Sequence, residues 1–374
     1  MTKTVFILGA GFSKEASAPS QEELVKKIFD IHAQSPHTFT HDTVNRFKQF
    51  LTDTLLIPER LHNNIPLEDI FTPLDRCLAD NISFRDLDAD AIKEIRGLIY
   101  YLIGKTLEYL LRSSEKAYID RFADYLVRTS SSRQNGQYRD IDNVSVLSMN
   151  WDILLDNSIK QNIDNNYREG AVVDYCCYIS SFWPHDRSVM PGLEMLGKGG
   201  FNVKLLKLHG SLNWLQCPRC QRVYIDFNNK IAIGQYEHPV HCRHCEHNFG
   251  NHKAHKLTSN LIMPTFLKNL SNPQYKLIWQ NAGIELAEAE KVVFIGYSLP
   301  QADFEMRQLL SRMIRPNAII EVVDYGDEDN PRIVDMMHRY NVFFGERNPI
   351  FHLRGARHYI NNNITIPYYD PFYS

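Results

Sequence analysis

The sequence predicts an α/β fold in which a parallel, Rossmann-like sheet carries a large helical insertion and a small cysteine-rich module. Three observations lead to this prediction. Short β-prone apolar runs occur near residue 3 and again after residue 142, and each ends in a glycine or polar turn. Between them lies a long block with the 3.6-residue period of helices. Near residue 220, two Cys-x-x-Cys pairs indicate a compact metal-binding unit.

Composition excludes several classes of protein. The 374 residues suffice for two or three domains of roughly 100–200 residues each. The hydrophobic fraction of 44% and the charged fraction of 23% are typical of a globular protein and exclude collagenous or broadly disordered chains. A net charge of −3 without long blocks of like charge gives no sign that nucleic acid is required. No apolar run approaches the roughly 18–20 residues of a membrane span and no export signal is evident, so we expect a cytoplasmic protein without membrane contact.

The first element is an apolar run over residues 3–8, followed by the turn Gly9-Ala10-Gly11-Phe12-Ser13 and a helix-favouring segment from residue 21. Strand, glycine turn and helix in this order allow the backbone to approach a pyrophosphate. The usual third glycine of the dinucleotide fingerprint is replaced by Lys14, so an ordinary dehydrogenase pattern fails. Pro19 delays the helix, and we expect an unusually long loop.

The second element is the block 21–140, which we expect to be an all-helical insertion. Its apolar residues recur at helical spacing, for example at Ile92, Ile95 and Ile99. The segments 86–90 and 130–136 are rich in aspartate and serine respectively, and predict helix boundaries and a loop. We expect the apolar stripes to form a core or a subunit interface.

Four further strand-like runs follow, over residues 144–148, 203–208, 291–295 and 319–323. Ligands of doubly wound sheets bind beyond the carboxyl ends of the strands, so the residues after these runs are the candidate site. These residues are Asn150-Trp-Asp152, His209-Gly-Ser211, Gly296-Tyr-Ser298 and Asp324.

The cysteine pairs Cys217–Cys220 and Cys242–Cys245 are separated by 21 residues and predict a closed structural zinc site. Disulfides are the alternative, and they are unusual in a protein without an export signal. The other three cysteines, at positions 77, 176 and 177, are expected to be buried apolar side chains. We therefore expect a Rossmann-like domain of residues 1–20 and 141–374, a helical domain of residues 21–140, and a zinc-binding module of residues 215–255.

The sequence resembles the sirtuin-like family in its motifs and in their order along the chain. These motifs are the glycine turn with Pro19, Asn150-Trp-Asp152, Leu208-His209-Gly210-Ser211, the cysteine pairs, Gly296-Tyr-Ser298-Leu-Pro300 and Asp324. The helical block, the segment Leu67 to Asp75 and the phrase Gly-Tyr-Ser-Leu-Pro resemble its divergent bacterial branch. Members of that branch often act as NAD-consuming effectors of antiphage defence.

Two departures from the deacylase sirtuins bear on the reaction. Their Pro-Asp-Phe-Arg and post-zinc Phe-Gly-Glu segments are replaced here by Pro19-Ser-Gln-Glu and by residues 262–268. The docking strand for an acyl-lysine peptide is thus in doubt, whereas the residues that cleave NAD are retained. The resemblance then implies that water is the acceptor and that the protein is an NAD glycohydrolase (an NAD⁺ nucleosidase), which releases nicotinamide and ADP-ribose.

The resemblance also implies the site residues. Asn150 would present its amide to the ribose or to a water. His209 would act as general base, because an imidazole exchanges protons near neutral pH. Asp152 would fix the loop or contact the nicotinamide. The expected cofactor-binding residues are Gly9, Ala10, Gly11, Phe12, Ser13 and Pro19 around the pyrophosphate, Asn150, Asp152 and His209 at the reaction end, and Gly296, Ser298 and Asp324 at the adenosine. Because Asp324 would repel a 2′-phosphate, we expect NAD rather than NADP.

Three alternatives remain at this stage: an NAD-dependent protein deacylase, a non-catalytic NAD or ADP-ribose sensor, and a nucleic-acid binder that uses Arg219, Arg222 and Arg243 of the zinc module. We expect a homo-oligomer, with the aromatic tail 368–373 docked on its own domain or on a neighbouring subunit. An activating partner, such as a hexameric DNA-translocating ATPase, is implied by the resemblance alone.

Overall fold

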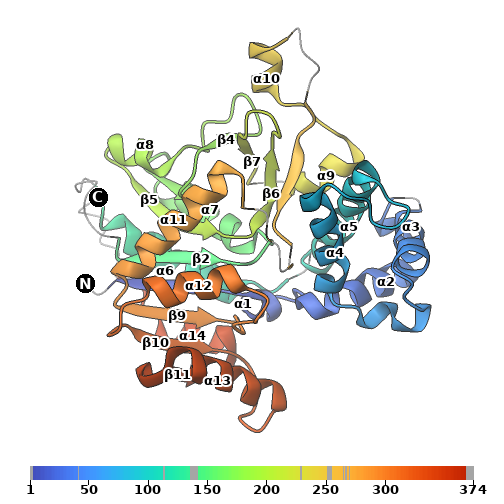
Figure 1. Ribbon diagram of the computed structural model, residues 1–374. Coiled ribbons are helices and arrows are strands. Elements are labelled where there is room, and N and C mark those ends of the chain that lie inside the picture. Colours follow the sequence, from blue (N-terminus) through green and yellow to red (C-terminus); the bar gives the residue numbers. More distant parts are fainter. Residues whose placement is uncertain are drawn as a thin grey trace.

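The computed structural model describes residues 3–40, 42–112, 114–134, 142–227, 230–250, 255–263, 265, 268 and 270–367. The aromatic tail 368–373 and the end of the loop 130–136 lie outside these residues. Within them, a seven-stranded parallel sheet forms the centre of the chain (Figure 1). Its strands, in spatial order, are β11 (Ile350–His352), β10 (Ile319–Val323), β9 (Lys291–Ile295), β1 (Thr4–Leu8), β2 (Val144–Ser148), β5 (Phe201–Lys207) and β3 (Ala171–Asp174).

The central strands are largely apolar because helices cover both faces of the sheet. Val5, Ile7 and Val146 have no exposed surface. Figure 1 shows α11 (Pro273–Glu288) and α12 (Phe304–Met313) across the near face. Further helices of this domain are α6 (Ala117–Ser131), α7 (Leu154–Asn166), α8 (Gly192–Gly197), α13 (Pro331–Phe344) and α14 (Gly355–Asn363). The expected α/β class with a parallel Rossmann-like sheet is confirmed.

A helical block lies beside the sheet and consists of α2 (Leu24–Gln34), α3 (Thr43–Gln49), a π-helical turn at Phe50–Thr54, α4 (Leu67–Asp80) and α5 (Ala89–Leu110). Its own core is built on residues such as Ile28, Phe71 and Leu98. Ile153, in the loop after β2, and Leu212, in the strand of residues 210–216, extend that core toward the ends of β2 and β5. The block therefore packs directly behind the candidate site.

Helix α6 packs differently from the rest of the range 21–140. Its apolar residues Ile119, Phe122 and Leu126 are part of the sheet core, not of the core of the helical block. The range assigned to the insertion from the sequence thus contains helices from two separate cores. The boundary between these cores lies between α5 and α6.

A second, four-stranded sheet carries the cysteine pairs. Its order is β4 (Ile179–Ser181), β7 (Val223–Ile225), β6 (Gly210–Gln216) and β8 (Thr258–Leu261), with α9 (Ile231–Glu237) and α10 (Arg243–Asn248) beside it. β6 begins immediately after His209, so the module is connected rigidly to the end of β5. Among the described residues, no helix combines the length and the apolar character that a bilayer crossing requires.

Candidate functional site

Five neighbouring strands end in the residues singled out from the sequence. In spatial order they are β10, β9, β1, β2 and β5, and the residues are Asp324, Gly296, Gly9, Asn150 and His209. Leu8 pairs with both Ser148 and Ile295, so the ends of the three middle strands are level. At about 4.8 Å between strands, the row extends over roughly 19 Å. Because β2 and β9 flank β1 on opposite sides, the row crosses the switch point where such sheets bind ligands.

The glycines of this row are required by close packing of two backbones. A Cβ atom on Gly11 would lie 2.6 Å from Cα of Gly296, and one on Gly9 would lie 2.4 Å from the oxygen of Gly296. Gly296 itself has a φ of +62°, which favours glycine. The amide of Gly11 donates to the oxygen of Gly296 at 2.9 Å. These contacts fix the ends of β1 and β9 against each other.

The segment after Gly9 differs from the loop expected from the sequence. It forms the short helix α1 (Ala10–Lys14), which starts directly after β1. Ala10 is exposed at its start, whereas the ring of Phe12 is buried against Tyr118. The short helix was unexpected because five residues show no helical period. The side chain of Phe12 therefore belongs to the core, and Pro19 is also buried.

Asn150, Ser13 and Asp152 form one hydrogen-bonded group. The amide of Asn150 donates to the oxygen of Gly9 at 2.9 Å and to Oγ of Ser13 at 3.3 Å. Ser13 Oγ donates to Oδ2 of Asp152 at 2.9 Å. The other oxygen, Oδ1 of Asp152, accepts from the amide of Leu154 at 3.1 Å and so caps the start of α7. Of the two roles considered for Asp152, this geometry favours the fixing of the loop.

A buried ion pair supports this group from below. Lys207, with 1% of its side chain exposed, donates through Nζ to the main-chain oxygen of Asp152 at 2.6 Å and to Asp156 Oδ2 at 3.2 Å. The Tyr175 hydroxyl donates to Oδ1 of Asp156 at 2.7 Å. A cavity of about 10 Å³ lies between this pair, Ser13 and Asn150, which is room for about one water.

His209 lies beside two charged residues that the sequence did not reveal. Its Nε2 atom is 3.6 Å from Oδ1 of Asp303, and Nζ of Lys268 donates to the same oxygen at 2.6 Å. Burial alone would raise the pKa of the Asp303 carboxyl, but His209 and Lys268 more than offset it and hold that pKa well below its usual range. Asp303 immediately precedes α12 and reads as an ordinary helix cap in the sequence, and Lys268 lies in a segment without periodicity.

The residues at the β9 and β10 end of the row make more contacts within the chain than expected. The main-chain oxygen of Ser298 accepts from Nε of Arg339 at 3.0 Å. Asp324 accepts two hydrogen bonds from the guanidinium of Arg332, at 3.1 and 3.2 Å. Since Arg332 offsets the charge of Asp324, the sequence argument that Asp324 repels a 2′-phosphate is weaker than it looked.

The four paired cysteines converge as metal ligands would. Sγ of Cys217 is 3.7 Å from Sγ of Cys245, and Cys220 and Cys242 are equally far apart. Four sulfurs at 2.3 Å around a tetrahedral zinc ion lie about 3.8 Å from one another, whereas a disulfide needs about 2.05 Å. Burial favours the neutral thiol, but the Tyr224 hydroxyl at 3.3 Å and neighbouring donors lower the pKa of Cys242 to about 7. The donor set and spacing fit zinc.

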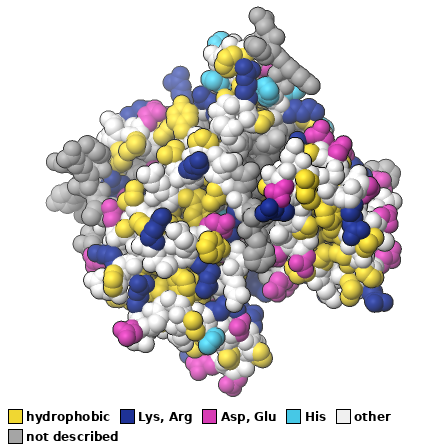
Figure 2. All heavy atoms as spheres, in the orientation of Figure 1, with side chains coloured by type: hydrophobic (Ala, Val, Ile, Leu, Met, Phe, Trp, Pro, Cys, Tyr) yellow, Lys and Arg dark blue, Asp and Glu magenta, His cyan; other side chains and the backbone are white. Residues whose placement is uncertain are grey.

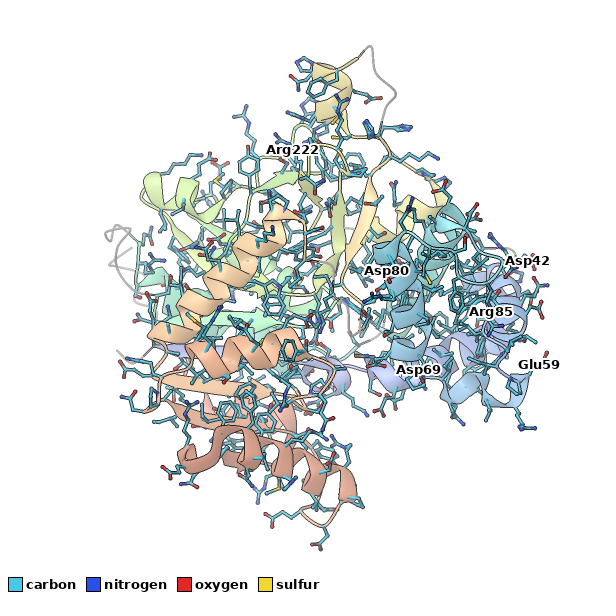
Figure 3. The ribbon with its side chains drawn as sticks, viewed as in Figure 1. Asp42, Glu59, Asp69, Asp80, Arg85 and Arg222 are labelled. Atoms are coloured by element: carbon cyan, nitrogen blue, oxygen red, sulfur yellow. The ribbon has the colours of Figure 1, made fainter. Side chains whose placement is uncertain are left out.

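The arginines of this module make contacts within the chain. Arg222 donates to Oγ of Ser180, Arg243 donates to the oxygens of Ser181 and Phe182, and the Arg219 guanidinium lies 4.2 Å from the ring centre of Phe249. Figure 3 shows Arg222 at the four-stranded sheet. Figure 2 shows basic and acidic side chains interspersed over the visible face, without a basic stripe, and histidines gathered around α10. These features give the nucleic-acid alternative no support.

The chain matches no protein-family model and no curated protein sequence. Solved structures similar in fold include a Sir2 homologue in complex with NAD, with 11% identity and a TM-score of 0.42 over 97% of this chain and 88% of that chain. A mutant Sir2 homologue in complex with ADP-ribose has 10% identity and a TM-score of 0.42 over 97% and 90%. A structure concerned with the mechanism and regulation of Sir2 enzymes has 11% identity and a TM-score of 0.41 over 96% and 89%. At such identities and scores, the function has to be argued from the residues of the site.

Proposed function

We propose that this protein is an NAD glycohydrolase, which converts NAD and water to nicotinamide, ADP-ribose and a proton. The observation that carries the proposal is the order of the strand ends. From β10 to β5, Asp324, Gly296, Gly9, Asn150 and His209 follow one another as an extended dinucleotide would need them, from the adenosine ribose to the scissile bond.

The chemistry requires little acid assistance. As the bond between the ribose C1′ and nicotinamide breaks, its electron pair moves to the ring nitrogen and neutralises the positive charge of the leaving group. The ribose gains oxocarbenium character, and a site that positions it and excludes bulk water lowers the barrier. The oxygen of a water molecule then bonds to C1′. His209 accepts the proton from this water or from a ribose hydroxyl, and Asn150 positions the reacting end through its amide.

Zinc would serve the structure of the protein only. Four cysteines would complete its tetrahedral shell and leave no position for a substrate. When bound, the ion would hold the ends of β6 and α10 together. The reaction is assigned to the parallel sheet, where His209 precedes the start of β6, whereas Cys217 follows its end.

The compact state of the site supports a regulated enzyme. The Asn150 amide bonds to Gly9 and Ser13, and the cavity beside it holds about one water. NAD would have to separate the loops after β1 and β2 before it could bind between them. We assign the regulation to this opening, driven by oligomer assembly or by an activating protein, as expected for an antiphage effector that must not consume host NAD at rest.

The test is release of nicotinamide from NAD by the purified chain, with His209→Ala and Asn150→Ala beside it and with His37→Ala, an exposed histidine of the helical block, as control. We expect release without any acyl-lysine peptide, and a loss of at least about 100-fold in the two site variants but not in the control. Release only with the peptide would instead identify a deacylase. Tight NAD binding without turnover, in the presence of candidate activators as well, would identify a sensor.

A further inference from the structure

A cluster of ionisable side chains surrounds one nitrogen of the His209 ring. Nε2 is buried and has no hydrogen-bond partner among the described residues, and Oδ1 of Asp303 lies 3.6 Å away. The other Asp303 oxygen, Oδ2, accepts from the Tyr297 hydroxyl at 2.6 Å. Lys268, only 2% exposed, donates to Asp303 Oδ1 at 2.6 Å and to Glu305 Oε2 at 2.9 Å. The carboxylate is thus held from two sides and faces the imidazole.

We propose that Asp303 is a positioning residue for His209, and that Lys268 holds Asp303 in place as a carboxylate. The proposal rests on the proposed function, because it assigns His209 as the base of that reaction. Asp303 keeps the proton of the neutral imidazole on Nε2, so Nδ1 is left with the lone pair that accepts a proton from water or from a ribose hydroxyl.

The charges of the cluster favour this division of roles. With a neutral imidazole, Asp303 and Glu305 carry two negative charges against one positive charge on Lys268. Transfer of a proton to Nδ1 makes His209 a cation and brings the net charge of these four side chains to zero. The proton then leaves to solvent when the products depart. In serine proteases, a carboxylate that holds the other ring nitrogen of the catalytic histidine contributes up to about 10⁴-fold to kcat, through tautomer and orientation.

The geometry fits a resting state that tightens on binding. At 3.6 Å the contact between Nε2 and Oδ1 is longer than a hydrogen bond, and such catalytic contacts often shorten in the substrate complex. Asp303 is buried, with 5% of its surface exposed, and is held by Lys268 and Tyr297, so the imidazole is the partner with freedom to move.

The test uses Asp303→Asn, which keeps the size and an acceptor for Tyr297, with Glu305→Gln as matched control. The control removes the other carboxylate that contacts Lys268 and leaves the pair of His209 and Asp303 intact. For Asp303→Asn we expect kcat to fall by about 100-fold or more with KM for NAD changed less than about threefold, and for Glu305→Gln a much smaller loss.

A second readout does not depend on activity. In protein with ¹⁵N-labelled histidine and bound ADP-ribose, where the contact between Nε2 and Asp303 should be short, we expect a downfield Nε2–H proton signal from His209. This signal should be absent in His209→Ala and Asp303→Asn and retained in Glu305→Gln. A wild-type imidazole that carries its proton on Nδ1 would overturn the proposal, and so would a downfield signal that persists in Asp303→Asn. If nicotinamide release is absent while the signal behaves as expected, the reaction is wrong and the positioning of His209 by Asp303 stands.

Discussion

The side-chain amide of Asn150 donates a hydrogen bond to the main-chain oxygen of Gly9 at 2.9 Å and thereby ties the end of β2 to the end of β1. The same amide reaches Ser13, which bonds to Asp152. One side chain therefore joins the two loops between which we place the reacting ribose. This dual position suggests that Asn150 contributes both to the stability of the resting site and to catalysis.

Replacement of Asn150 by alanine should separate these contributions. We expect Asn150→Ala to lower the free energy of unfolding by about 1 kcal/mol, since a net hydrogen bond is worth about that much, and to abolish nicotinamide release. Asn281→Ala is the matched control, because the Asn281 amide also donates to main-chain oxygens, of Cys176 and Leu277. A variant at Asn281 that loses activity as fully would contradict the special role of Asn150.

The glycines at the strand ends should tolerate no side chain. Gly11→Ala places a Cβ atom 2.6 Å from Cα of Gly296, so a backbone has to shift, and we expect destabilisation of about 1–3 kcal/mol or more. Gly97→Ala in α5 meets no atom within 4 Å and should stabilise the protein by about 0.5–1 kcal/mol. Urea unfolding of both variants measures the contrast. Equal effects would mean that β1 and β9 are not packed as described.

The buried pair of Lys207 and Asp156 should show strong coupling. Lys207→Met leaves the Asp156 carboxylate buried without its cation, which typically costs about 3–5 kcal/mol. The double variant with Asp156→Asn should recover part of this loss. A double-mutant cycle of unfolding free energies gives the coupling, and an additive cycle would show that the two side chains do not form a pair in solution.

Removal of the metal should affect the stability of the cysteine module. We expect about one zinc ion per purified chain, and its loss in Cys217→Ser or Cys245→Ser together with a lower melting temperature. Cys77→Ser, in α4 outside the cluster, should keep its zinc. Elemental analysis measures the zinc content of each variant. A full complement of zinc in the Cys217 variant would exclude the four-cysteine site.

The Asp303 carboxyl should make stability depend on pH in the acid range. Because His209 and Lys268 hold its folded-state pKa below the ordinary value of 3.8, its contribution is fully present above that value. The contribution is lost progressively as the pH falls below 3.8 toward the folded-state pKa. Unfolding free energies measured from about pH 5 down to about pH 2 should therefore fall more steeply in the wild type than in Asp303→Asn. Parallel curves would show that Asp303 is not paired.

The sequence was sufficient for the five inner strands of the parallel sheet, but not for its edge strands β3 and β11 or for all of the site. Five strands were predictable because each apolar run is bounded by turn residues, and the cysteine spacing predicted a cluster that the structure brings together. Helix α6 shares the apolar period of α5, and periodicity alone cannot say against which core a helix packs. Asp303 and Lys268 were missed because their significance arises only from a contact with His209, which lies far away along the chain.

The measurement that tests the central claim most directly is the product analysis of NAD incubated with the purified chain in the absence of any peptide. The account predicts nicotinamide and ADP-ribose in equal amounts from the wild type and neither product from His209→Ala. Unchanged NAD in both samples under every condition that opens the site, or cleavage that persists without His209, would contradict it.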